Sequence, residues 1–359
     1  LVQLIEDLKA GKVDLLIVDD SDPLHALPNS TGIKKALKNT FTVSLASQIN
    51  ETSSEADLQL PALTDYESWG DAFPRSGVRS IRQPVMAPFS LFEAKAREDV
   101  MLAAAKAVNP ESFEGISDYR DFIRKEWQSI QQDTGDRSHF DQFWVKVLEE
   151  GGLFSKPNLK SVSLKDEVGQ LKIVETKISG TGLTLIPTTS LFHGDGRGAR
   201  NPWLQEVPDP MSQIVWDSWM EINPDTAKKM GIKDRSVVQL KTSQGSIKAT
   251  AFYHFGIHRD AVAIPIGQGH ENSGDVADGF GVNVMNLLPT EMDESGSLAL
   301  VTTRAELNPV EDLSYTVNLD GNARQLGRNI AAATTVDELN NSDHHKSKPH
   351  FQPHELEFY

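Results

Sequence analysis

The sequence contains no cysteine, fewer basic than acidic residues, and no long apolar run. Without cysteine, these residues form no disulfide, no cysteine-bound iron–sulfur cluster and no cysteine–metal bond. The formal net charge of −16, from 35 Lys and Arg against 51 Asp and Glu, argues against a nucleic-acid partner, because phosphate binding needs clustered cations. No segment approaches the roughly 20 apolar residues that span a bilayer, so we expect no direct membrane insertion.

With 359 residues, the chain is long enough for two domains with separate cores. Its hydrophobic fraction of 38% and charged fraction of 24% are typical of a globular protein. The acidity favours solubility, or alternatively a surface that steers a basic redox partner. The sequence begins without Met inside an apolar-periodic segment that includes Ile5 and Leu8, which indicates a C-terminal piece of a longer protein.

Residues 1–155 alternate helical and strand patterns, which predicts βαβ units with a parallel sheet. The expected elements are a helix ending at residue 10, a strand at 13–18, a helix at 32–38, and strands at 41–46 and 57–62. Helical spacing then predicts helices at 89–108, 117–132 and 139–149. The loops that follow the strands are where open α/β sheets bind ligands.

Residues 156–305 are rich in short strand patterns, interrupted by a helix at 225–230, and this favours a closed β-barrel. The expected strands lie at 171–178, 183–189, 237–242, 246–255, 261–266 and 298–303. Residues 306–359 have few apolar runs and indicate an extended C-terminal linker.

The sequence NPWLQEVPDP at 201–210, followed by EINPDTA at 221–227, resembles the last domain of the molybdopterin oxidoreductases. The resemblance continues through AVAIPIGQGH at 261–270. It implies that the barrel is a double-psi β-barrel, similar to the molybdopterin dinucleotide-binding domain, and that it follows a Rossmann-like parallel-sheet domain.

Upstream, DLLIVDDSDP at 14–23 and ETSSEADLQLPA at 51–62 are similar to the preceding domain of the same family. The sequences ESWGD at 67–71 and RQPV at 82–85 look most like the B subunit of alternative complex III. Polysulfide and tetrathionate reductase catalytic subunits are the next most similar group.

The resemblance places Asp22 and Pro23 where the family has a Gly-x-Asn-Pro-like sequence that meets the pterin dinucleotide. Here Asp19, Asp20 and Asp22 put carboxylates where a pyrophosphate should approach, and repulsion would oppose binding. The loop is therefore either a site that has lost its cofactor or an ordinary acidic turn.

Other cofactor-binding candidates follow the strands of both domains. Hydrogen-bonding groups of the first domain could meet guanine or pterin edges or act as buried caps; those groups belong to Glu51, Thr52 and Asp57. In the barrel, two glycines let the backbone approach a planar ligand closely; the barrel candidates are Gly267, Gln268, Gly269, His270 and Asn283. His270 either contacts that ligand or is simply hydrogen-bonded, because no second ring or carboxylate lies at metal spacing.

No catalytic residue or metal ligand is assigned from the sequence. The histidines of the tail lie in a Lys/Ser/Pro-rich context that favours solvation or adventitious metal binding over a metal site; they are His344, His345, His350 and His354. No Ser/His/Asp or paired-carboxylate motif indicates nucleophilic catalysis.

The resemblance implies a fragment of a quinol-oxidising, membrane-associated electron-transfer complex at the periplasmic face of a bacterial inner membrane. It implies a scaffold without bound molybdenum, with molybdopterin guanine dinucleotide present only in active relatives. The implied partners are an iron–sulfur domain of the same parent chain, which carries the clusters, a membrane quinol-binding subunit and cytochrome c subunits. The alternatives are the bis-pterin molybdenum-binding part of a polysulfide- or tetrathionate-type reductase, and a free-standing nucleotide-binding module.

Overall fold

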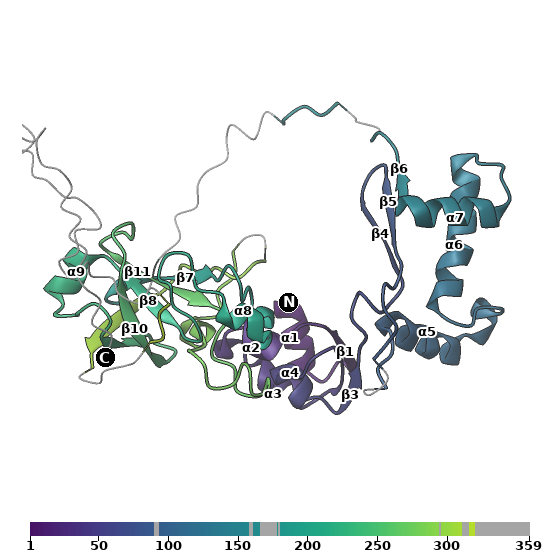
Figure 1. Cartoon of the computed structure of the whole chain (residues 1–359). Coiled ribbons are helices and arrows are strands. Elements are labelled where there is room, and N and C mark those ends of the chain that lie inside the picture. The colour runs from purple at the N-terminus through teal and green to yellow at the C-terminus, as the bar shows by residue number, and fades with distance from the viewer. Residues whose placement is uncertain are drawn as a thin grey trace, which may run out of the picture.

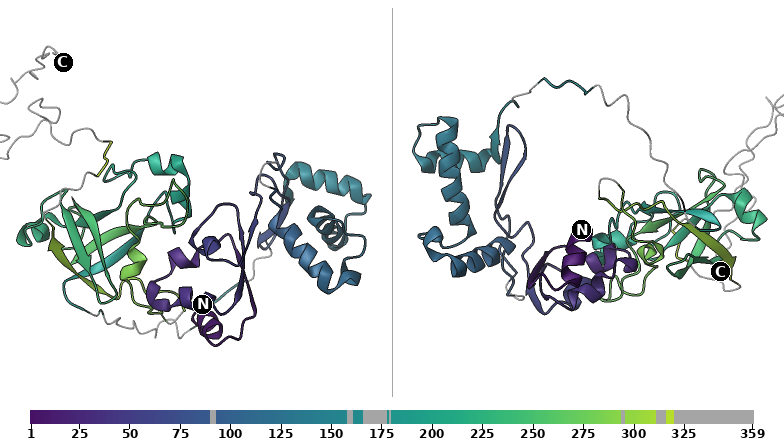
Figure 2. Two further views of the ribbon diagram at one scale, coloured as in Figure 1. Left: turned by 90° about the horizontal axis from the view of Figure 1, so that it is seen from below. Right: turned by 180° about the vertical axis from the view of Figure 1, so that it is seen from behind.

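The computed structural model describes residues 1–89, 93–157, 161–165, 178, 180–293, 296–310 and 316–319. Three units follow one another along the chain (Figure 1). An α/β unit lies between a β-barrel and a helical unit, and views from two further directions show the same arrangement (Figure 2). Among the described residues, no helix is both long and apolar enough to cross a membrane.

The α/β unit contains a parallel sheet in the order β1-β2-β3, as the alternating pattern predicted. Its helices α1 and α3 bury an apolar cluster that includes Leu8 and Ile33, and Leu16 of β1 packs against this cluster. The elements are α1 (Val2–Lys9), β1 (Leu15–Asp19), α2 (Pro23–Ala26), α3 (Ile33–Leu37), β2 (Phe41–Ala46), α4 (Glu51–Ser54) and β3 (Leu58–Pro61).

Two short helices, α2 and α4, follow strands β1 and β2 and carry residues of the α/β unit that contact the barrel. Helix α2 begins with Pro23 in its first turn, where the missing N–H costs no hydrogen bond. Helix α4 begins with a capping box, in which the Asn50 side chain accepts from the Ser53 N–H and Ser53 Oγ accepts from the Asn50 N–H. These caps fix the direction in which Glu51 and Thr52 enter the site.

The helical unit has its own antiparallel sheet and core. The sheet order is β4-β5-β6, and Trp127 is fully buried in a cluster with Phe143 and Trp144. The elements are β4 (Gly70–Arg75), β5 (Val78–Arg82), α5 (Arg97–Val108), α6 (Tyr119–Thr134), α7 (Phe140–Glu150) and β6 (Gly152–Phe154).

The sequence predicted α6 and α7 but missed this sheet, because its short strands have exposed residues and weak apolar alternation. The expected helix at 89–108 was too long, since α5 begins at Arg97.

The barrel is closed, with strand order β10-β8-β11-β7-β12-β9. The pairs β8/β10 and β7/β11 are parallel and the others are antiparallel, in agreement with the double-psi expectation. Leu185, Ile222 and Val262 are fully buried in its core. The elements are β7 (Leu183–Thr189), α8 (Pro202–Glu206), β8 (Trp219–Ile222), α9 (Pro224–Lys229), β9 (Val237–Lys241), β10 (Ser246–Tyr253), β11 (Ala261–Ile266) and β12 (Arg304–Pro309).

The end of the barrel differs from the expectation. The strand expected at 298–303 is wrong, because Leu298 makes only an isolated bridge with Met292 and the ladder begins at Arg304. Strand β12 therefore continues past residue 305. The strand expected at 171–178 and most of the linker expected at 306–359 lie outside the described residues.

Candidate functional site

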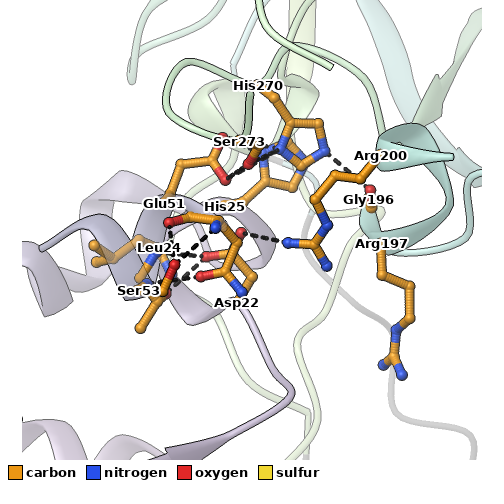
Figure 3. A network of polar contacts seen from close by, with 12 residues as sticks. Asp22, Leu24, His25, Glu51, Ser53, Gly196, Arg197, Arg200, His270 and Ser273 are labelled. Carbon is orange, nitrogen blue, oxygen red and sulfur yellow. Dashed lines mark hydrogen bonds and ion pairs between the residues drawn. The ribbon is translucent and has the colours of Figure 1, made fainter. Parts of the chain in front are cut away.

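The candidate site lies at the seam between the α/β unit and the barrel (Figure 3). Helices α2 and α4 supply His25 and Glu51, and the loop after β11 supplies His270 and Ser273. The segment around Gly196, between β7 and α8, closes the other side. Residues far apart in the sequence thus meet where the parallel strands end.

Glu51 connects the two units by several hydrogen bonds. Its carboxylate lies 2.9 and 3.1 Å from Nδ1 of His270, and it accepts from Ser273 Oγ at 2.6 Å and from the Glu271 N–H at 3.0 Å. Burial alone would raise the pKa of Glu51, but the hydrogen bonds, above all that of His270, outweigh it and lower this pKa. Glu51 is therefore ionised at neutral pH.

Both ring nitrogens of His270 face oxygen acceptors. Nε2 lies 3.0 Å from the Gly196 carbonyl oxygen, opposite the Glu51 contact of Nδ1. The ring of His25 stacks on that of His270, with centroids 3.7 Å apart and 12° between the planes. Burial, helped by the neighbouring charge of His270, lowers the pKa of His25 to about 4, so this ring is neutral at pH 7.

Asn283 holds His25 from the barrel side. Its Nδ2 donates to the His25 carbonyl oxygen at 2.9 Å and lies 3.2 Å from Nδ1 of the same ring. A neutral His25 that accepts this amide contact carries its proton on Nε2.

Asp22 lies beside the same cluster and contacts Thr52 and Arg200. One of its oxygens accepts from the Thr52 N–H at 3.0 Å and from Thr52 Oγ1 at 2.7 Å, and the other lies 3.8 Å from Nη1 of Arg200. Burial, together with the neighbouring Glu51, raises the pKa of Asp22 to about 6. Figure 3 shows Arg200 directed toward Asp22 and Arg197 directed away.

The other two carboxylates of the acidic loop, Asp19 and Asp20, are paired with a cation from a distant helix. Arg97, at the start of α5, lies 3.1 Å from Asp19 and 3.4 Å from Asp20. The repulsion expected from this loop is therefore partly compensated inside the protein, although each pair is partly exposed and screened.

The cofactor-binding candidates of the barrel pack against other groups of the protein. A Cβ on Gly269 would lie 2.0 Å from the Asn283 nitrogen, and one on Gly267 would lie 2.9 Å from His193 Cβ. Gln268 is buried and forms a reciprocal amide pair with Gln205, at 2.7 and 3.1 Å.

The structure brings some of the predicted cofactor-binding residues together at the seam and places others elsewhere. Asp57 accepts from the Thr42 N–H at 2.8 Å, so it caps the sheet rather than facing the seam. The predicted residues that meet at the seam are Asp22, Glu51, Thr52, His270 and Asn283. No sequence signal marks His25, Arg200 or Ser273, because each is brought to the seam only by the packing of distant segments.

A polar cavity of about 170 Å³ adjoins the cluster. Asparagine, carboxylate and lysine side chains line it, among them Asn29, Lys34, Glu55, Glu271, Asn272 and Asn286. The only lysine among the lining residues, Lys34, pairs with Glu55 at 2.9 Å. The cavity therefore offers amide groups and a negative balance of charge.

Comparisons with known proteins agree with this architecture. Residues 197–311 match the Molydopterin dinucleotide binding domain family. The chain is 25% identical, over 299 residues, to the menaquinone reductase molybdopterin-binding-like subunit of Nitratidesulfovibrio vulgaris, covering 82% of the chain and 41% of that relative. It is 23% identical, over 280 residues, to the assimilatory nitrate reductase catalytic subunit of Bacillus subtilis, covering 74% and 39%.

Among solved structures, acetylene hydratase from Pelobacter acetylenicus has the same fold, with a TM-score of 0.59 and 16% identity over 85% of this chain and 46% of that one. The chain spans about two fifths of the length of the curated relatives it matches. Most of the barrel thus matches the molydopterin dinucleotide binding domain family, and the chain is similar over most of its length to the two curated relatives.

Proposed function

We propose that this chain is part of a molybdopterin-oxidoreductase-like subunit in a quinol-oxidising electron-transfer complex of the alternative complex III type. In this proposal the two domains form a scaffold that binds no molybdenum. The name of one relative, a menaquinone reductase subunit described as molybdopterin-binding-like, supports a link to quinone chemistry.

The residues at the seam do not fit the pyrophosphate of a pterin dinucleotide. The adjoining cavity, at about 170 Å³, is smaller than the roughly 300–1,000 Å³ of typical ligand sites. Its lining includes Glu51, Glu55 and Glu271, and Lys34 is already paired. Bringing a pyrophosphate beside these carboxylates would cost Coulomb energy.

The observation that carries the proposal is that protein groups fill the positions expected to receive a ligand. The spaces beside Gly267 and Gly269 are occupied by His193 and by the backbone of residues 282–283. Glu51 binds His270 and Ser273, which closes the two units onto each other. A seam closed in this way supports a structural role.

The remaining parts of the proposal concern the surroundings of the chain. We place it at the periplasmic face of a bacterial inner membrane. Its partners are an iron–sulfur domain of the same parent polypeptide, a membrane quinol-binding subunit and cytochrome c subunits. Electrons would pass through those partners, since this segment supplies no cysteine for a cluster.

A second candidate is the bis-pterin molybdenum-binding part of a polysulfide- or tetrathionate-type reductase. The cavity favours it in one respect, because Asn29, Asn272 and Asn286 offer the amide groups that pair with the edge of a guanine or pterin ring. The nitrate reductase relative is a catalytic subunit by name.

The deciding experiment measures molybdenum, tungsten, iron and pterin fluorescence in the full-length parent purified from its native membrane. We expect iron and sulfide without molybdenum, tungsten or pterin. Stoichiometric metal and pterin would overturn the scaffold proposal in favour of the reductase.

A matched test uses guanosine diphosphate with the same preparation. The scaffold proposal predicts that the nucleotide leaves the melting temperature unchanged, because a ligand that binds only the folded state must raise it.

A further inference from the structure

A group of three metal-ligand side chains has no role in the binding of a pterin dinucleotide as discussed above. Its members are His25, Glu51 and His270. One possible ligand atom from each lies within 4.8 Å of the others. The side chains of the two histidines are 3% and 1% exposed, and that of Glu51 is 13% exposed. Two imidazoles and one carboxylate are a common ligand set for zinc and other divalent first-row metals.

We propose that His25, Glu51 and His270 bind a divalent transition-metal ion, such as Zn²⁺, which joins the α/β unit to the barrel. The Glu51 Oε1 atom lies 2.9 Å from Nδ1 of His270 and 3.7 Å from Nδ1 of His25. Ligand atoms around tetrahedral zinc lie roughly 3.3–3.5 Å apart, given bonds of about 2.0–2.1 Å. The two distances bracket that separation.

The contacts of His270 resemble those of a metal-bound histidine. Metal-bound histidines usually donate their other ring N–H to a carbonyl or carboxylate, which fixes the tautomer. Nε2 of His270 lies 3.0 Å from the Gly196 carbonyl oxygen, so Nδ1 is the atom that turns toward Glu51. Ser273 Oγ, 3.1 Å from that Nδ1, adds an oxygen beside the group.

Metal binding must change the histidine stack. The two rings are nearly parallel, at 12°, so their in-plane lone pairs do not converge on one point. His25 therefore has to turn about its Cβ–Cγ bond and give up the 3.2 Å contact between its Nδ1 and Asn283. This rearrangement makes the bound and free forms distinguishable.

The test uses the full-length protein, prepared without an affinity tag, treated with EDTA and titrated with Zn²⁺. We expect one tightly bound equivalent and a rise in melting temperature. X-ray absorption of the zinc-loaded wild type should show N/O ligation with two imidazoles. Absence of imidazole scattering would overturn the proposal without requiring any variant to fold.

Two variants, Glu51→Gln and His25→Gln, should each weaken zinc binding by more than the roughly 10–100-fold that is lost when a metal ligand loses a hydrogen-bond partner. The matched control is His254→Gln, which removes another histidine–glutamate pair, 2.9 Å from Glu221 in the barrel. It should bind as the wild type does.

Adventitious binding is tested separately by replacing the four tail histidines with Gln; these are His344, His345, His350 and His354. We expect the tight equivalent to persist. Its loss in this variant, or unchanged binding in both seam variants, would refute the metal site.

Discussion

Replacing Gly269 with Ala tests whether this glycine serves the packing of the barrel or the approach of a ligand. Gly269 has a φ of +84°, and a Cβ there would lie 2.0 Å from the Asn283 nitrogen and 2.3 Å from the Val282 carbonyl carbon. Carbon atoms in contact normally lie about 3.5–4.0 Å apart. The backbone of the neighbouring loop must therefore move.

Gly274 provides the matched control, because it has a φ of +90° and a Cβ there would meet no heavy atom of the described residues within 4 Å. A left-handed conformation costs a non-glycine residue roughly 1–2 kcal/mol, so we expect that loss from Gly274→Ala. The clash in Gly269→Ala adds about 1–3 kcal/mol. It also strains the Asn283 amide contact with the His25 carbonyl.

The free energies of unfolding of the wild type and the two variants are measured by urea denaturation, followed by tryptophan fluorescence. A difference of about 2 kcal/mol between the variants corresponds to roughly 1 M in the urea midpoint. Equal losses in the two variants would refute the packing argument. A nearly neutral Gly269→Ala that lost nucleotide binding would instead support the ligand role.

Three further predictions address the other units and the charges at the seam. Trp127→Ala should cost about 3–5 kcal/mol, because this side chain is fully buried, and hydrogen exchange should show the loss confined to the helical unit. Burial lowers the pKa of His193, so stability should fall as pH drops from 6.5 toward that lower pKa; His193→Gln should flatten this pH slope in thermal scans. Asp22→Asn should cost roughly 3 kcal/mol in denaturation experiments, because Arg200 is 8% exposed and would lose its only ion-pair partner among the described residues; a neutral result would refute that pairing.

Much of the fold could be predicted from the sequence, because apolar periodicity is strong where one face is buried. Strands β2, β7 and β11 have the predicted bounds, since each is a largely buried or half-buried strand with clear ends. The sheet β4-β5-β6 could not be predicted in this way, because few of its residues are buried and its strands show no clear apolar alternation. The strand expected at 298–303 is wrong, because the apolar run there does not pair with a strand of the barrel, and β12 begins only at Arg304.

The candidate site was harder to predict than the fold. Glu51 and His270 were singled out separately, but 219 residues separate them, and no local spacing indicates that they pair. No second ring or carboxylate lies at metal spacing from His270 in the sequence, so the sequence predicts no metal role for this residue. The structure supplies that ring from His25, whose place after β1 follows only from the docking of the barrel on the α/β unit.

Two carboxylates of the α/β unit make contacts with the barrel across the seam. Asp22 lies 3.8 Å from Arg200, and Glu51 lies 2.9 Å from the ring of His270. Hydrogen bonds and ion pairs that involve a carboxylate are stronger than neutral ones. Because Arg200 and His270 both come from the barrel side, these contacts hold the two domains together, and the stability of the seam depends on the two carboxylates.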